Sequence, residues 1–259
     1  MSDARALPAA ADLTDDGFLG GRLRILQPKA GHRAGIDAVM LAAAVPAKQG
    51  DRVLEAGIGV GAAALCLAAR VSGVMLTGVE VDAAVAGIAV ENARRNGFAD
   101  RVRVEQADVA APGKAMRGAG LGPESFDHAY ANPPFHAEKR VRAPRDPARA
   151  RANVHGPGDL DAWARFLVAS VKPGGTVSMI LPASSIGEAL ALFARRLGDL
   201  RIFPLYPRAA APASRVIVRG VKGSRAAPSL LPGLVLHGSG NAFTEEAEAV
   251  LRHGAALNL

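Results

Sequence analysis

The sequence has little cysteine, few aromatic residues and no long apolar run. Its 259 residues include one cysteine, Cys66, so no disulfide can form within the chain, which fits a reducing compartment. Cys66 lies in the apolar run ALCLAAR, and we expect it in the core because a free thiol packs like a small hydrophobic side chain. Since no stretch of about 18 consecutive apolar residues exists, we expect no membrane-spanning helix.

Signals for export and for metal binding are also missing. The N-terminal segment MSDARALPAAAD lacks the charged start and long apolar run of a signal peptide, so we expect a cytoplasmic protein. The 6 histidines are scattered, and together with the single cysteine they show no ligand spacing typical of a metal site. We therefore expect neither a membrane partner nor a bound metal.

Positive charge is in excess, with 31 Lys and Arg against 24 Asp and Glu, a net charge of +7. This balance suits a polyanionic partner such as nucleic acid, because Lys and Arg that neutralise phosphates release condensed counterions. A basic protein without such a partner has the same composition, so charge alone leaves the partner open.

From residue 53 onward, short apolar strands alternate with helices, which predicts an α/β fold with right-handed crossovers and a mostly parallel sheet. Two late strands with no helix between them predict a hairpin and an antiparallel edge. We divide the chain into an N-terminal extension, residues 1–49, a main domain, residues 50–223, and a C-terminal extension of that domain, residues 224–259. The expected strands are 53–57, 74–81, 101–109, 126–135, 176–182, 200–207, 214–223 and 234–237, and the expected helices are 60–71, 83–96, 159–171, 184–197 and 244–252, with a turn at 172–175.

A glycine loop follows the first strand of the main domain and begins a helix. It reads Glu55-Ala-Gly57-Ile-Gly59-Val-Gly61. Glycines in this context let the backbone approach a ligand closely. The G-x-G-x-G spacing is tighter than the G-x-G-x-x-G of dinucleotide-binding proteins. Glu55 lies two residues before the first glycine, where a carboxylate can hold the ammonium group of a ligand.

Acidic residues end the next two strands. Glu80 can accept hydrogen bonds from both hydroxyls of a ribose, and Asp108 can accept one from an adenine amino group. The neighbouring Val81 and Val109 belong to the same expected ligand site. Each acid has a local alternative, a helix cap or a turn residue, and Asp82 is a candidate cap for the following helix. Their common position beside a glycine loop favours the ligand site, because ligands bind at the carboxyl ends of strands in open α/β sheets.

These motifs resemble those of the Rossmann-like class I methyltransferases, and the resemblance covers roughly residues 50–223. It implies a mostly parallel seven-stranded sheet with an antiparallel last strand, and S-adenosylmethionine as the cofactor. It also implies that the glycine loop, Glu55, Glu80 and Asp108 hold that cofactor. Proteins that bind NAD are the main competitors for this pattern.

The fourth strand ends in Asn132-Pro133-Pro134-Phe135, the most specific signal in the chain. The two prolines end the strand and hold the backbone extended. Two hydrogen bonds from one NH₂ group can then be accepted by the Asn132 side-chain oxygen and the Pro133 carbonyl. We also expect Asn132 to lie beside the cofactor. Phe135 offers a flat face for stacking a base. The alternative is a plain strand terminator. The tetrad resembles the motif of amino-group methyltransferases, which act on adenine-N6, guanine-N2, cytosine-N4 or glutamine nitrogen.

The segment 26–41 combines a glycine-containing loop with an apolar helix, and we expect it to pack over the cofactor pocket. Arg33 can meet the cofactor carboxylate and Asp37 can cap the helix, although an ordinary capped helix is an equal alternative. Together with the core motifs and a C-terminal Phe243-Thr244-x-Glu246, this segment resembles the bacterial tRNA(Val) adenine-N6 methyltransferase family. The resemblance implies adenine-N6 of a tRNA as the acceptor.

A basic segment follows the tetrad directly. It holds six basic residues and one acid, and such a loop beside an active site can follow an RNA backbone. The alternative is a solvated surface. The expected RNA-binding residues are Lys139, Arg140, Arg142, Arg145, Arg149 and Arg151.

Other acceptors and classes stay open at this point. Guanine-N2 methyltransferases of RNA share Asn-Pro-Pro-Phe-His but usually carry a second domain, for which this chain has no room. Protein-glutamine methyltransferases usually have Tyr after the prolines, and a small-molecule acceptor is a further alternative. A non-catalytic module is disfavoured by the intact motifs, and a nucleotide-dependent oxidoreductase by the glycine spacing.

Overall fold

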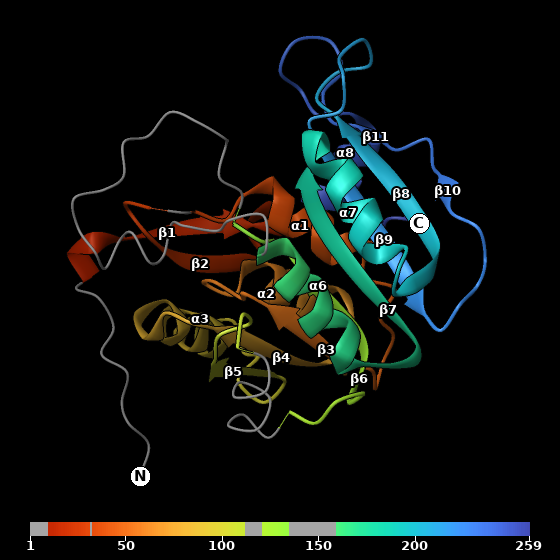
Figure 1. The fold of residues 1–259 in the computed structure, drawn as a ribbon. Helices are drawn as coiled ribbons and strands as arrows, with labels where there is room; N and C mark the ends of the chain where they lie inside the picture. The colour runs from red at the N-terminus through yellow and green to blue at the C-terminus, as the bar shows by residue number, and fades with distance from the viewer. Residues whose placement is uncertain (1–9, 32, 112–120, 135–158) are drawn as a thin grey trace, which may run out of the picture.

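The computed structural model describes residues 10–31, 33–111, 121–134 and 159–259, which form a central sheet with helices on both faces (Figure 1). The strands are β1 (Leu13–Phe18), β2 (Leu23–Pro28), β3 (Arg52–Ala56), β4 (Met75–Glu80), β5 (Val102–Gln106), β6 (Phe126–Ala131), β7 (Val171–Pro182), β8 (Leu197–Tyr206), β9 (Arg215–Lys222), β10 (Ser229–Leu230) and β11 (Leu234–Val235). The helices are α1 (Ile36–Ala44), α2 (Ala62–Arg70), α3 (Ala83–Arg95), α6 (Asp159–Ser170), α7 (Ile186–Phe193) and α8 (Glu245–Leu251).

The strand order of the main sheet is β10-β8-β9-β7-β6-β3-β4-β5. Strands β5, β4, β3, β6 and β7 run parallel, whereas β9 is antiparallel to both β7 and β8. This arrangement confirms the mostly parallel α/β sheet with an antiparallel last strand. The seven expected strands are β3 to β9, and β10 and β11 bring the sheet of the described residues to nine strands. The antiparallel strand is not at the edge, however, because β9 inserts between β7 and β8, and β8 pairs outward with β10 and β11.

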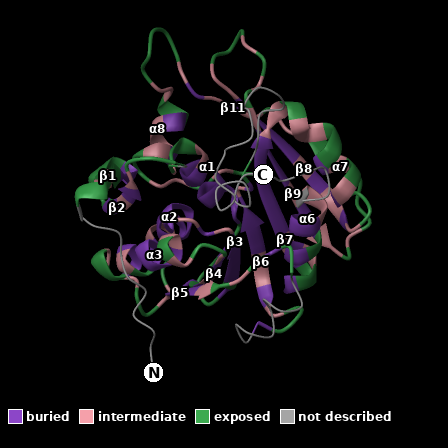
Figure 2. Cartoon of the chain, turned by 60° about the vertical axis from the view of Figure 1, so that its left-hand side comes forward, coloured by how far each residue is buried: buried purple, intermediate pink, exposed green. Residues whose placement is uncertain are grey.

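Two hydrophobic cores fill the space between the sheet and its helices. Helices α1, α2 and α3 pack on one face, and α6 and α7 pack on the other. Small side chains let the helices lie close, and every residue of α1 from Ala38 to Ala44 is buried. Strand β3 in the centre is buried along its length except at Arg52 (Figure 2). A helix that is apolar on all sides needs partners all round, and α1 has them in α2, α8 and β7.

The N-terminal extension contains an element that the sequence does not predict, the antiparallel hairpin β1–β2. Its first strand reads LTDDGF, and two aspartates and a glycine are uncommon in strands. The hairpin packs on α3, and residues 19–21 close it with Leu19, Gly20 and Gly21 all at positive φ. The proposed boundaries at residues 49 and 223 stay predictions.

The C-terminal extension packs against α1 through α8. The expected helix is present as α8, with the Thr244 hydroxyl accepting a hydrogen bond from the Ala247 N–H, while the expected strand at 234–237 is reduced to β11. The chain then continues beside α1, where the Leu257 N–H donates to the Ala43 carbonyl at 2.9 Å. Leu234, Leu236, Ala247 and Val250 therefore lie in the same hydrophobic core as α1 and α2.

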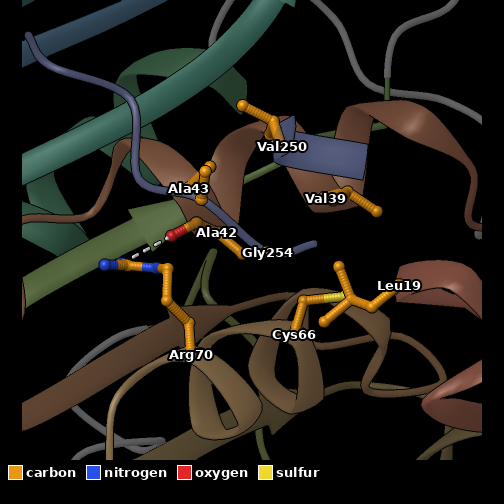
Figure 3. Close-up of a pocket in the computed structure, with 9 residues that line it drawn as sticks. Leu19, Val39, Ala42, Ala43, Cys66, Arg70, Val250 and Gly254 are labelled. Atoms are coloured by element: carbon orange, nitrogen blue, oxygen red, sulfur yellow. Dashed lines mark hydrogen bonds between the residues drawn. The ribbon is translucent and has the colours of Figure 1, made fainter. Parts of the chain in front are cut away.

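The seam between α1, α2 and α8 holds a small pocket of about 10 Å³, lined by Cys66 and Arg70 among others (Figure 3). That volume is close to the minimum for one water molecule, so the pocket has no room for an organic ligand. Cys66 is buried there, as expected for a core thiol. Arg70 spans the seam by donating hydrogen bonds to the carbonyls of Ala42 and Val45.

The expected turn at Lys172–Gly175 lies inside β7 as an irregularity. On β6, Phe126 pairs with Val171 and His128 pairs with Thr176. Residues 172–175 of β7 therefore have no partner in β6 and form a bulge. None of the helices in the described ranges is long and apolar enough to cross a membrane. The same ranges contain no group of three or more His, Cys, Asp or Glu arranged to hold a metal ion.

Candidate functional site

The predicted site residues follow the carboxyl ends of four neighbouring strands. Strands β6, β3, β4 and β5 are adjacent and parallel, so the segments after them lie along one edge of the sheet. The chain order reverses at β3, because β4 and β5 lie on one side of it and β6 and β7 on the other. Ligands bind in open α/β sheets at such a reversal, outside the carboxyl ends.

The glycine loop serves two different needs. Gly57 has φ +66°, and a Cβ there would lie 2.5 Å from Cη2 of Trp163 on α6, so packing alone excludes a side chain. Gly59 has φ +55°, and a Cβ there would meet nothing within 4 Å. Gly59 therefore exposes its backbone to open space at the edge of the sheet, which is where a ligand can approach closely.

Glu80 ties this loop to the end of β4. Its Oε2 accepts a hydrogen bond from the Gly59 N–H at 3.0 Å, and its Oε1 accepts from the N–H groups of Val81 and Asp82 at 2.9 and 3.1 Å. Burial raises the pKa of Glu80, and the backbone donors of Asp82, Gly59 and Val81 oppose that shift. Two carboxylate oxygens offer about four acceptor positions, so capacity remains for a further donor.

The other residues at the ends of β4 and β5 differ in exposure. Val81 is 61% exposed, which is unusual for a large aliphatic side chain next to a buried strand, whereas Val109 is buried. Asp82 caps α3 by accepting from the N–H groups of Ala84 and Val85, which confirms the alternative role considered for it. Asp108 is exposed, and its Oδ1 accepts from the Ala110 N–H at 2.8 Å.

Glu55 faces the interior behind the glycine loop. Its side chain is 4% exposed, and its Oε2 accepts a hydrogen bond from the Tyr130 hydroxyl at 2.9 Å. Burial raises the pKa of Glu55 to about 8, against the opposing hydrogen bonds from Tyr130 and the Ala64 backbone. Burial also raises the pKa of Tyr130 well above its ordinary value. Without a ligand, both side chains are therefore mainly protonated and uncharged at neutral pH.

Asn132, Pro133 and Pro134 follow β6 directly, at the same edge as the glycine loop. Pro133 is buried, Asn132 is partly exposed and Pro134 is exposed. Burial of the middle proline fixes the backbone on which its carbonyl and the Asn132 side chain depend. Phe135 and the six basic residues expected to bind RNA lie outside the described residues.

Arg33 and Asp37 bond to other parts of the protein. The Arg33 guanidinium pairs with Asp16 at 2.5 Å and also donates to the Thr14 hydroxyl and the Pro28 carbonyl. Asp37 lies in the first turn of α1, but the N-cap of that helix is Gly35. The expectation that Asp37 caps the helix is wrong, because its carboxylate instead accepts from Arg215 Nε at 2.8 Å.

Two buried amides near the site have no counterpart among the predicted residues. Asn92 on α3 and Gln27 on β2 are 0% and 2% exposed, and both hydrogen-bond to backbone groups of the N-terminal segment. The available signal is the run Glu91-Asn-Ala-Arg-Arg-Asn96, in which two asparagines four residues apart lie on one side of a helix.

Comparison with known proteins gives a consistent picture. Residues 33–145 match the family described as methyltransferase small domain. A protein of Serratia proteamaculans (strain 568), named tRNA1(Val) (adenine(37)-N6)-methyltransferase, is 32% identical over 205 residues, which cover 78% of this chain and 75% of that protein. One of Dickeya chrysanthemi (strain Ech1591) with the same name is 29% identical over 211 residues, covering 80% and 79%.

A crystal structure from Agrobacterium tumefaciens, described as a predicted O-methyltransferase, has a TM-score of 0.71 to this chain at 30% identity. The alignment covers 85% of this chain and 98% of that one. This chain thus shares its arrangement of strands and helices with nearly the whole length of that solved structure.

Proposed function

The chain belongs to the methyltransferase family of these relatives and is an S-adenosylmethionine-dependent methyltransferase, and we propose that it methylates the N6 amino group of an adenine in a tRNA. The observation that carries the proposal is the position of Asn132-Pro133-Pro134 beside the glycine loop. The Agrobacterium structure is described as an O-methyltransferase, but a pair of acceptors suits a group with two hydrogens to donate, which a hydroxyl is not.

The residues at the carboxyl edge fit the proposed cofactor. The open space at Gly59 is a cradle that any side chain would occupy, and the remaining acceptor position of Glu80 suits a ribose hydroxyl. The exposed Val81 offers an apolar surface for the adenine ring, we assign Val109 to the same site, and the Asp108 carboxylate suits the adenine amino group. Bound there, S-adenosylmethionine supplies a methyl group carried on a positively charged sulfur.

Arg33 and Glu55 are proposed to hold the amino-acid end of the cofactor. Arg33 has five N–H donors, of which three engage Asp16, Thr14 and Pro28, so donors remain for a carboxylate. Glu55 is assigned to the ammonium group, since a cation nearby favours the ionised carboxylate and offsets the cost of burial. Gly57 and Gly61, which both have positive φ, shape the backbone of the glycine loop.

Asn132 and Pro133 orient the acceptor nitrogen. The lone pair of an exocyclic amine is delocalised into the ring, which makes the nitrogen a poor nucleophile. Hydrogen bonds from its two hydrogens to the Asn132 side-chain oxygen and the Pro133 carbonyl favour a pyramidal nitrogen and direct its lone pair at the methyl group. Holding the reacting atoms about 3–3.5 Å apart supplies much of the rate. The extra proton leaves the nitrogen after transfer, so no strong base is required.

The substrate proposal extends to residues beyond the described ranges. Phe135 is assigned to stacking on the target base, and the segment Lys139 to Arg151 to the RNA backbone. The names of the two tRNA-modifying relatives and the net charge of +7 support RNA as the partner.

The test is nucleoside mass spectrometry of tRNA from a strain lacking this gene, after incubation with the pure protein and S-adenosylmethionine. We expect new N6-methyladenosine compared with a reaction without enzyme. New N2-methylguanosine would show that the acceptor is guanine and not adenine. If protein that binds the cofactor produces no methylated nucleoside, the RNA proposal is overturned.

A further inference from the structure

Asn92 on α3 and Asn96, the C-cap residue of the same helix, hold the hairpin β1–β2 in the same way. The Asn92 Oδ1 accepts from the Leu26 N–H at 2.8 Å, and its Nδ2 donates to the Leu26 carbonyl at 3.0 Å. One turn later, the Asn96 Oδ1 accepts from the Arg24 N–H at 2.9 Å, and its Nδ2 donates to the Arg24 carbonyl at 2.8 Å. Each side-chain amide thus replaces a neighbouring strand for one residue of β2.

The two asparagines differ in their third hydrogen bond. The Asn92 Nδ2 also donates to the Val60 carbonyl at 2.9 Å, inside the glycine loop. The corresponding bond of Asn96 returns to the Asn92 carbonyl within the helix. Asn92 is 0% exposed, so both of its donors and its acceptor are used away from water. Of the two, only Asn92 joins the hairpin to the loop.

From Leu26 the connection continues to the segment before α1. The next residue, Gln27, is 2% exposed, and its Oε1 accepts from the Ala34 N–H at 2.7 Å. Its Nε2 donates to the Asp16 carboxylate at 2.8 Å and to the Ala34 carbonyl at 3.3 Å. The same Asp16 oxygen pairs with Arg33. Hydrogen bonds link Val60 through Asn92 to Leu26, the peptide bond joins Leu26 to Gln27, and further hydrogen bonds link Gln27 to Ala34 and, through Asp16, to Arg33.

We propose that Asn92 is a positioning residue for the cofactor. It fixes the separation between the glycine loop and the segment that carries Arg33, so that both reach the amino-acid end of the cofactor together. The inference rests on the proposed function and deepens it. Asn92 touches no cofactor atom in this scheme and acts through Val60 and Leu26.

Asn96 provides a matched control, because Asn96→Ala removes the same backbone clamp one turn away and leaves the link to Val60 intact. The dissociation constant of S-adenosylmethionine would be measured by calorimetry on the full chain, together with Tm. We expect Asn92→Ala to raise that constant on the order of tenfold, the equivalent of one buried hydrogen bond. Asn96→Ala should lower Tm and leave the constant within about twofold.

Gln27→Leu tests the same connection from its other end and keeps the experiment decisive if Asn92→Ala does not fold. It breaks the contacts with Ala34 and Asp16 while leaving Asn92 in place, and it should also weaken cofactor binding. In turnover assays, Asn92→Ala should raise the KM for S-adenosylmethionine and leave the KM for RNA unchanged, a split that general destabilisation does not produce.

The proposal is overturned if folded Asn92→Ala and Gln27→Leu both bind the cofactor as the parent protein does. It is also overturned if Asn96→Ala weakens binding as much as Asn92→Ala, because attachment of the hairpin would then matter and the link to Val60 would not. A parent protein that binds cofactor but methylates no RNA would contradict the proposed function alone, since the binding constants can still be compared.

Discussion

Similar polar residues lie at the amino-terminal and the carboxyl ends of the parallel strands, but they bond to different kinds of partner. At the amino-terminal side, the His128 ring lies between Asp51 and Thr176, at 3.1 and 2.8 Å, and the three side chains satisfy one another. At the carboxyl edge, Glu80 bonds to the backbone of the segments that follow the strands, beside open space at Gly59. Closed clusters stabilise the fold, whereas polar groups bound to loop backbone keep acceptor capacity for a ligand.

The largest expected effect is at Asn132, the acceptor of the target amine in our proposal. Asn132→Ala should lower kcat by about 100-fold or more, because one of two oriented hydrogen-bonding groups is lost from the transition state. Calorimetry should give an unchanged dissociation constant for S-adenosylmethionine, since the glycine loop and Glu80 remain. Turnover at the parent rate would show that Asn132 does not act in catalysis.

The next effect is on cofactor affinity at Glu80. Glu80→Ala removes the proposed ribose contacts and also the bonds to Gly59, Val81 and Asp82. We expect binding to weaken by about 10- to 100-fold, which corresponds to one or two charge-assisted hydrogen bonds. Asp51→Asn, at the opposite edge, is the control and should bind the cofactor normally. If both variants lost the same cofactor affinity, the carboxyl ends of the strands would not be specific for the cofactor.

Glu55 gives a smaller effect, on stability and its dependence on pH. The pKa of Glu55 is about 8 in the fold against 4.5 as the ordinary value, so the folded state keeps a proton that the unfolded state releases. This contribution to stability is complete below pH 4.5 and is lost as the pH rises through 8. Between those two values, the free energy of unfolding falls by about 1.4 kcal/mol for each pH unit.

Glu55→Gln keeps an acceptor for Tyr130 and removes the titration. Urea unfolding should therefore show the variant to be more stable than the parent at pH 8, with a smaller difference at pH 5. The same variant should bind S-adenosylmethionine more weakly if Glu55 holds the ammonium group. An unchanged affinity would limit Glu55 to supporting the loop from behind.

The smallest effect is expected at the amino-terminal side. Burial lowers the pKa of His128 below 6.5, and Asp51 opposes the shift. The unfolded state then binds the proton more tightly, so this contribution to stability is present above pH 6.5 and is lost as the pH falls through the lowered pKa. His128→Gln should reduce the loss of Tm between pH 7 and 5 and leave kcat at pH 7.5 unchanged. A fall in kcat would connect this cluster to catalysis.

Several features of the fold and site followed from local patterns. The strands before Gly57, Asp82 and Asn132 are short apolar runs that end in glycine, acid or proline, and each pattern lies within a few residues. Such patterns need no knowledge of distant contacts, which is why the α/β class, the sheet with its antiparallel last strand and the order of the motifs along one edge were predictable.

Other features depend on residues far apart in the chain. Asp37 has the position of a helix cap, yet Arg215, which is 178 residues away, takes its carboxylate. Glu55 has the position of a ligand contact, yet its carboxyl bonds to Tyr130 in the neighbouring strand, 75 residues away. Neither partner is visible from the motif itself.

The sequence by itself determined the alternation of strands and helices from β3 to β9 and the chemical groups that follow β3, β4 and β6, because these depend on spacing along the chain. Only the tertiary structure decided that β9 lies between β7 and β8, that Trp163 excludes a side chain at Gly57, and that Asn92 ties the hairpin to the glycine loop. These are contacts between segments brought together by burial of apolar surface, and their geometry is set by packing across the whole domain.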